Sequence, residues 1–451
     1  MRQTRPMSRS LSRAGRSRLL SWVVPVVLVL AAFVSVVVHV PQNTELSPLD
    51  EYVYVDYIAK VPSEGVVAEG EPTGAFAREA LVCLGNRGVA TVVPTSCADA
   101  GTAPASDFPM AGKTSADIYT PLYFWVTRAL AQPLVWAGVG LIDAASLVGA
   151  LWLAGALVLL VFAMRRWRVR EPVILGLGLF LIASPAAYWS STYISTDAPS
   201  LAVGAALALV VARFATGGRG LWLLPVVSAV GVAFKVQNIA AVGIAVLAVV
   251  VTTVVRTAQQ DDSGGAWGVA RRAVLSRPVV TAVGSAVLAL VVQGVWLVVR
   301  SDLRVALPPD QGTARPLHIG DMVGESLKFL AGTPTDPTGV ENGWQIATAG
   351  LVLGWLSVAG VLGAIGAVAD GRGVRPLAWS ALVVALLLGP MLVLGTVLVS
   401  GYYFALPTRY GLSMLPVFLV LAGVVLSRYR APGVLLAIAG AASFAASLTG
   451  S

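Results

Sequence analysis

The stretch LLSWVVPVVLVLAAFVSVVVHV, residues 19–40, decides the class of this protein. It contains no Asp, Glu, Lys or Arg, and about 20 mostly apolar residues are enough for a helix to cross a hydrocarbon core of roughly 30 Å. Six arginines precede it: Arg2, Arg5, Arg9, Arg13, Arg16 and Arg18. A cleavable signal peptide would have a shorter apolar core and an A-x-A site after it. We therefore interpret residues 19–40 as a retained signal anchor and residues 1–18 as a basic cytoplasmic tail.

Similar apolar runs recur along the whole chain of 451 residues. They lie near 142–164, 172–189, 197–214, 221–237, 239–255, 279–299, 346–368, 377–399, 411–427 and 433–449. With 57% apolar and 12% charged residues, the composition differs from the roughly 25% charged residues of soluble proteins and excludes an ordinary cytosolic enzyme. The pattern predicts an all-α fold, a polytopic transmembrane bundle of about eleven spans.

The distribution of charge predicts the orientation of the bundle. With the N-terminus inside, the inner loops and the tail hold 20 of the 31 basic residues and four of the 23 acidic ones, so the inner side carries about +16 and the outer side about −8. This asymmetry is what the positive-inside rule demands, and an odd number of spans places the C-terminus outside. The net charge of +8 therefore indicates membrane topology rather than binding of nucleic acid.

Two outer segments are too long to be simple connections. Residues 41–141 form a long first loop, rich in Pro, Gly, Ser, Thr and acidic residues, and residues 300–345 form a second. They divide the spans into the first helix, helices 2–7 within 142–299, and helices 8–11 within 346–451. The only two cysteines, Cys83 and Cys97, fall in the first loop, where an oxidising compartment favours a disulfide. Two free thiols are the alternative.

Ionisable side chains beside the spans are the most informative residues, because each costs perhaps 2.5–3.5 kcal/mol at mid-bilayer. Nearly all of them map to the outer face: Asp50, Glu51, Asp56, Asp117, Asp197, Lys235 and Arg409. Segments far apart in the sequence thus bring carboxylates and cations to one depth, which indicates a functional site there. No P-loop, dinucleotide fingerprint or H-E-x-x-H motif is present, and the isolated His39 and His318 have no metal-ligand spacing.

Four of these residues also have a structural interpretation. The segment PLDEYVYVDYIAK, residues 48–60, predicts a helix along the membrane surface, and Ser47 with Asp50 fits a capping box. Asp197 fits a helix N-cap, Lys235 fits a side chain that snorkels to the interface, and Arg409 fits an interfacial anchor.

Four short motifs together resemble the GT-C superfamily of polytopic glycosyltransferases, which use polyprenyl-phosphate sugars. They are the acidic pair Asp50-Glu51, IYTPLYF at 118–124, SSTY at 190–193 followed by Asp197, and RYGLSMLP at 409–416. The resemblance covers most of the chain and extends to uncharacterised actinobacterial membrane proteins related to the superfamily. Tyr54 and Tyr119-Thr120 stand where the family often has histidines.

The resemblance implies hexosyl or pentosyl transfer from a polyprenyl-phosphate-linked sugar to an envelope glycan, lipid or protein acceptor. The reaction would take place on the outer side of a bacterial cytoplasmic membrane. It assigns Asp50 as the general base, with Glu51 as the second candidate. Asp117 and Asp197 would orient the acceptor or hold a divalent cation, Mg²⁺ or Mn²⁺, and Lys235 and Arg409 would bind the donor phosphate.

Two other classes of membrane protein compete with this hypothesis. A transporter or lipid flippase predicts pseudo-repeats, broken spans in matching halves and charges at mid-bilayer, whereas the charges here gather on one side. A non-catalytic envelope assembly protein would keep the fold without the activity. A shared cavity lined by the outer charges would favour catalysis.

Overall fold

The computed structural model describes residues 8–88, 95–260, 265–307, 315–335, 337–338, 343–367 and 373–449. The N-terminal part of the predicted basic tail, residues 1–7 with Arg2 and Arg5, lies outside the described residues. The described residues form helices and loops, with isolated β-bridges in place of strands. The prediction of an all-α protein is confirmed.

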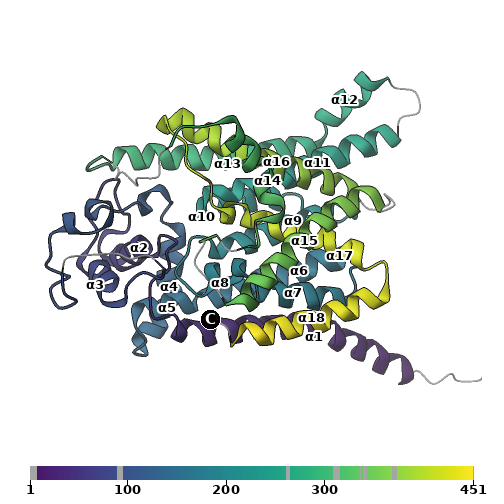
Figure 1. The fold of residues 1–451 in the computed structure, drawn as a ribbon. Helices are drawn as coiled ribbons and strands as arrows, with labels where there is room; N and C mark the ends of the chain where they lie inside the picture. The colour runs from purple at the N-terminus through teal and green to yellow at the C-terminus, as the bar shows by residue number, and fades with distance from the viewer. Residues whose placement is uncertain are drawn as a thin grey trace, which may run out of the picture.

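The helices follow one another along the whole chain (Figure 1). The first half contains α1 (Ser8–His39), α2 (Glu51–Glu64), α3 (Ala75–Leu84), α4 (Leu122–Trp136), α5 (Leu141–Leu147), α6 (Gly149–Arg166), α7 (Glu171–Ile182), α8 (Pro185–Ser191), α9 (Ala198–Ala215) and α10 (Leu223–Phe234). The second half contains α11 (Ile239–Gln259), α12 (Ala266–Val274), α13 (Arg277–Asp302), α14 (Ile319–Ala331), α15 (Trp344–Ala367), α16 (Val374–Ser400), α17 (Leu415–Leu426) and α18 (Arg430–Ser447). Two 3₁₀ segments, η5 (Val236–Asn238) and η6 (Thr408–Met414), matter for the site.

Among the described residues, nine helices are long and apolar enough to cross a membrane, so the chain is a multi-pass membrane protein. Two of the eleven predicted spans are not among these nine helices. The run at 172–189 consists of α7 and α8, bent by 58°, because the helix stops before Pro185, whose ring cannot continue it. The run at 221–237 consists of α10, which at 12 residues is about 18 Å long.

The short helix α10 nevertheless returns the chain to the end of the bundle where α9 begins. Lys235 directly follows α10, and Asp197 directly precedes α9. The Nζ atom of Lys235 donates a hydrogen bond to Asp197 at 2.6 Å. We call this the loop end, because residues 43–88 and 95–140 lie there, at the left of Figure 1. The helix α12, between α11 and α13 in the sequence, lies at the opposite end (Figure 1).

The first loop is a folded unit of short helices, and its first helix corrects one prediction. The expected surface helix is present as α2, but its residues 51–58 are buried within the protein rather than laid along a membrane. Tyr52 bonds to Thr73 (2.7 Å), and the ring of Tyr57 stacks on Phe124 at 3.9 Å between centroids. The tyrosines therefore find polar or aromatic partners inside the unit. The predicted disulfide between Cys83 and Cys97 is also confirmed.

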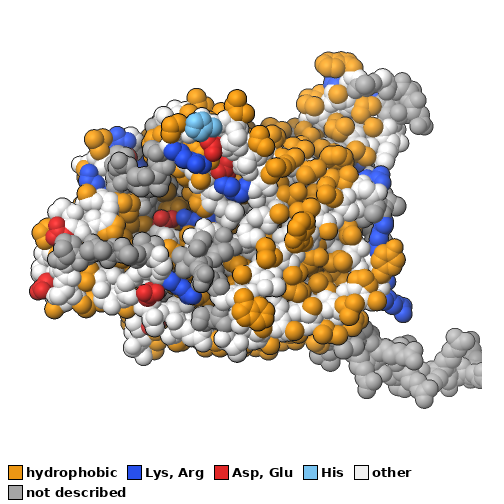
Figure 2. Space-filling model, viewed as in Figure 1, with side chains coloured by type: hydrophobic (Ala, Val, Ile, Leu, Met, Phe, Trp, Pro, Cys, Tyr) orange, Lys and Arg blue, Asp and Glu red, His pale blue; other side chains and the backbone are white. Residues whose placement is uncertain are grey.

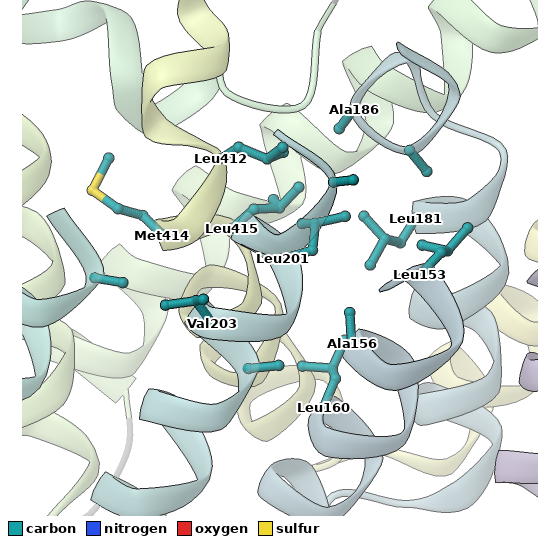
Figure 3. Packing of buried hydrophobic residues seen from close by; sticks show 14 of the residues in the cluster. Leu153, Ala156, Leu160, Leu181, Ala186, Leu201, Val203, Leu412, Met414 and Leu415 are labelled. Atoms are coloured by element: carbon teal, nitrogen blue, oxygen red, sulfur yellow. The ribbon is translucent and has the colours of Figure 1, made fainter. Parts of the chain in front are cut away.

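The core of the bundle brings η6 against α9. Figure 3 shows Leu201 of α9 beside Leu415 of α17 and close to Leu412 of η6. A side-chain carbon on Gly204 would lie 2.0 Å from the carbonyl oxygen of Ser413, a distance that van der Waals contact forbids. Glycine at 204 thus permits the close approach that places Arg409, in η6, beside the start of α9.

The outer surface of the bundle is apolar over much of its area, as Figure 2 shows. Along α13 the exposed large side chains include Val280, Val283, Val287, Leu290, Val295 and Val298. An exposed apolar surface of this kind suits lipid. The second loop also contains a helix that the sequence analysis did not predict, α14, which packs against α16.

Candidate functional site

Four of the predicted site residues form one chain of ion pairs at the loop end. The Nη2 atom of Arg409 donates to Asp50 Oδ2 at 2.6 Å, and its Nη1 atom donates to Asp197 Oδ2 at 3.2 Å. Lys235 donates to the other oxygen of Asp197, Oδ1, at 2.6 Å. Because two carboxylates face two cations, the cluster is electrically balanced, which buried charges require.

The backbone around each residue explains how the four meet. Asp197 directly precedes α9, and Lys235 is an extended residue between α10 and η5, with φ −160° and ψ 127°. Arg409 lies in η6, which Gly204 allows to lie against α9. Asp50 directly precedes α2. The ends of four segments therefore supply the cluster, as the sequence predicted for these residues.

The capping interpretation of Asp50 is wrong in its geometry. Asp50 has φ 64° and ψ 11°, a left-handed conformation that is strained for a residue other than glycine, and its side chain makes no capping hydrogen bond. Glu51 accepts from the Ser47 amide (2.6 Å) instead. The side chain of Asp197 also makes no capping bond, because it accepts from Lys235 and Arg409. Both carboxylates are thus aimed at cations.

Three tyrosines surround the buried cations. Lys235 Nζ lies 5.6 Å from the ring centroid of Tyr119 and 5.7 Å from that of Tyr410, within reach of a cation–π interaction. The hydroxyl of Tyr54 donates to that of Tyr119 at 3.2 Å. Tyr54 and Tyr119 occupy the positions where the resembling family often has histidine, and in this chain they line the cluster from the first loop.

A cavity of about 500 Å³ opens beside one end of the cluster. Its lining residues are Asp50, Arg315, Phe404, Ala405, Pro407, Arg409 and Tyr410. Asp50 is the accessible carboxylate, since its side chain is 43% exposed and that of Asp197 is 4% exposed. Arg409 is buried, and its Nε atom has no hydrogen-bond partner. Lys235 is fully buried behind Asp197 and does not line this cavity.

Glu51 lies elsewhere than its neighbour Asp50, beside a second cavity of about 540 Å³. Its two oxygens accept hydrogen bonds from the backbone amides of Ser47 (2.6 Å) and Ile194 (2.7 Å). Burial raises the pKa of Glu51 from 4.5 to about 7, although the two amides act to lower it. The contacts of Glu51 join the start of α2 to the loop before α9, which is a structural role.

The raised pKa of Glu51 predicts how stability depends on pH. The folded state binds the proton more tightly than the unfolded state, so this contribution is complete below about pH 4.5 and is lost as the pH rises through about 7. Glu51→Gln removes the titration. We expect the melting temperature of the wild type in detergent to fall between about pH 5 and pH 8 more steeply than that of the variant. Parallel profiles would contradict this assignment.

Asp117 and Asp56 do not join the cluster. Asp117 accepts from Arg300 Nε at 2.7 Å, and Glu69 pairs with both Arg300 and Arg304. Burial raises the pKa of Asp117 despite the attraction of Arg300. Asp56 pairs with Lys60 at 3.2 Å. These ion pairs hold the first loop together and to the end of α13, so the contacts of both carboxylates are structural.

The carboxylates of the cluster do not fit a divalent cation. Mg²⁺ needs oxygen ligands at about 2.0–2.1 Å in octahedral geometry, but both oxygens of Asp197 already accept from Lys235 and Arg409. Within the described ranges, no group of three or more His, Cys, Asp or Glu side chains could hold a metal ion.

One basic residue of the cavity, Arg315, was missed by the sequence analysis. It belongs to the second loop, in which the sequence analysis named no candidate site residue. One signal in the sequence could have drawn attention to Arg315. It lies four residues before an apolar stripe at four-residue spacing, formed by Ile319, Val323 and Leu327.

No protein-family model and no curated protein sequence matches the chain. Among solved structures, it is similar to ArnT from Cupriavidus metallidurans in the apo state, with 17% identity over 93% of this chain and a TM-score of 0.48. It is also similar to the same protein bound to undecaprenyl phosphate, with 18% identity, 93% coverage and a TM-score of 0.47. The chain spans 61% and 62% of the lengths of those two chains. At this level of likeness, function has to be argued from the side chains.

Proposed function

We propose that the protein is a GT-C-like membrane glycosyltransferase that moves a sugar from a polyprenyl-phosphate donor to a hydroxyl acceptor at the loop end. The acceptor would be an envelope glycan, lipid or protein. The observation that carries this proposal is the pairing of an accessible carboxylate, Asp50, with a buried arginine, Arg409, on the wall of one open cavity. General-base catalysis needs an accessible carboxylate and stabilisation of a leaving phosphate needs a cation, so both groups must face the same cavity.

The reaction assigns a separate task to each group. The Asp50 carboxylate takes the proton of the acceptor hydroxyl as that oxygen forms a bond to the anomeric carbon. The bond from the anomeric carbon to the phosphate oxygen breaks on the opposite face, which inverts the configuration. The guanidinium of Arg409 stabilises the negative charge that builds on the departing polyprenyl phosphate. Asp197, held by Lys235, fixes the position of Arg409.

The proposed location follows from charge. Both α9 and α11 begin near the cluster and have an arginine, Arg213 and Arg256, in the last turn at their other end, and the positive-inside rule assigns such basic ends to the cytoplasm. The loop end would then face the outside of a bacterial cytoplasmic membrane. A headgroup-level cavity suits a donor whose phosphate lies at the interface and whose prenyl chain lies in lipid. Charges at the ends of helices, rather than at mid-bilayer, do not favour a transporter.

The test is a transfer assay with the full-length protein in nanodiscs. Polyprenyl-phosphate sugars carrying a radiolabelled hexose or pentose would be incubated with an envelope extract from a strain lacking the gene. We expect label to move into an acceptor fraction, with one equivalent of polyprenyl phosphate released for each sugar transferred. Absence of transfer with every donor, together with an unchanged envelope glycan composition in the deletion strain, would favour the non-catalytic assembly protein.

A further inference from the structure

A second hollow of about 410 Å³ adjoins the Asp50–Arg409 cavity, and Arg315 lines both. The other residues that line it are Pro316, Leu317, Val397, Gly401, Tyr402 and Tyr403. Except for Arg315 and the tyrosine hydroxyls, this lining carries no polar side chain. Arg315 therefore lies where a charged cavity meets an apolar one, and its side chain is 51% exposed.

The position of Arg315 is fixed by its neighbours. Its backbone pairs with that of Tyr403, with Arg315 N donating to Tyr403 O at 2.9 Å. Its guanidinium lies 4.8 Å from the ring centroid of Tyr403 and donates to Asp321 at 3.1 Å. The Tyr403 hydroxyl donates in turn to Glu325, at 2.9 Å. Arg315 is thus held at the rim by α14 and by the chain after α16.

Exposed apolar side chains lie close to the second hollow. On α14 the exposed large side chains are Ile319, Val323 and Leu327, at intervals of four residues, so they share one face of the helix. On α16, Leu398 next to the lining residue Val397 is 84% exposed. In a membrane protein, such a surface contacts lipid chains. The second hollow therefore connects the guanidinium of Arg315 with a surface that contacts lipid chains.

We propose that Arg315 binds the donor phosphate together with Arg409, and that the first isoprene units of the donor occupy the hollow lined by Leu317, Val397 and Tyr402. The inference rests on the proposed function. It differs from the expectation, drawn from the sequence, that Lys235 contacts the phosphate, because Lys235 is fully buried and pairs with Asp197. Arg409 and Arg315 line the same cavity, and the guanidinium of Arg315 is exposed there, so both side chains face the space that the phosphate oxygens would occupy.

The test compares lipid binding and transfer by the wild type, Arg315→Gln and a control, Arg304→Gln, in nanodiscs. Arg304 is similarly exposed but pairs with Glu69 and lines neither cavity. The probes are undecaprenyl phosphate, undecaprenol and phosphatidylglycerol. We expect Arg315→Gln to weaken binding of undecaprenyl phosphate roughly tenfold, as loss of one charge-assisted contact would, and to leave undecaprenol unaffected. The donor KM should rise while kcat stays within about twofold.

The outcomes separate the two proposals. If Arg315→Gln binds undecaprenyl phosphate as tightly as Arg304→Gln does, the assignment of Arg315 is wrong and the proposed function stands. If the wild type binds phosphatidylglycerol as tightly as undecaprenyl phosphate, the hollow is a general phospholipid site and the inference is overturned. If the wild type neither binds undecaprenyl phosphate nor transfers sugar, the proposed function fails.

Discussion

Asp50→Asn is expected to lower the rate of sugar transfer about 10²- to 10⁴-fold, the usual effect of removing a general base. The amide oxygen of asparagine can still accept from Arg409, and Arg409 keeps its second carboxylate, Asp197. The side chain is 43% exposed, so the substitution creates no buried unpaired charge. The variant should therefore insert and melt like the wild type while its kcat falls. Initial rates at saturating donor and acceptor measure this.

Asp107→Asn is the matched control, because Asp107 is an exposed aspartate of the same loop and does not line the cavity. It should retain wild-type rates. A well-folded Asp50→Asn protein that transfers sugar at the control rate would remove the base assignment. The same experiment with Glu51→Gln separates the neighbouring carboxylates, since the loss of Glu51 should lower activity only as far as it lowers the folded fraction.

Arg409→Gln has the second large expected effect. Arg409 joins Asp50 to Asp197, and its guanidinium is the buried cation on the wall of the cavity. Its loss leaves one carboxylate without a cation and the leaving phosphate without its donor. We expect kcat to fall about 10²- to 10³-fold, as on removal of a charge-stabilising donor, and the donor KM to rise. Stability should also fall, by about 1–3 kcal/mol, measurable as a lower melting temperature.

Two further variants distinguish catalysis from folding at this position. Arg409→Lys keeps the charge, but one ammonium group cannot reproduce the two-sided contact of a guanidinium, so an intermediate rate is expected at near wild-type stability. Lys235→Gln should destabilise the protein, because Asp197 then depends on Arg409 alone, but should raise the donor KM less than Arg409→Gln. Equal donor KM values for Lys235→Gln and Arg409→Gln would place Lys235 in the phosphate site after all.

The meeting of Asp50, Asp197, Lys235 and Arg409 could be predicted from the sequence, because each lies at the end of an apolar run on the same predicted side. Alternation of spans brings such ends to one depth whatever the lateral arrangement of the helices. The depth of a charged residue in the membrane does not decide, however, which residue it forms an ion pair with. Asp117 meets the same criterion but pairs with Arg300 at the end of α13, since lateral packing of the first loop determines which charges meet.

The remaining differences also come from tertiary packing. The sequence of residues 48–60 indicates a helix in which apolar and polar residues are mixed. Such a helix can lie on a membrane surface or pack inside a folded loop equally well. Burial of Tyr52 and Tyr57 against Thr73 and Phe124 decides in favour of the loop. Arg315 could not be assigned, because its importance depends on the chain after α16 returning to pair with it.

The most direct test of the site is an electron cryomicroscopy structure of the full-length protein in nanodiscs with undecaprenyl phosphate. The predicted result is phosphate density within about 2.7–3.2 Å of the Arg409 guanidinium nitrogens, with the Asp50 carboxylate on the open side of the cavity and the prenyl chain leading past Val397. Phosphate bound away from Arg409, or at the opposite end of the bundle, would contradict the account.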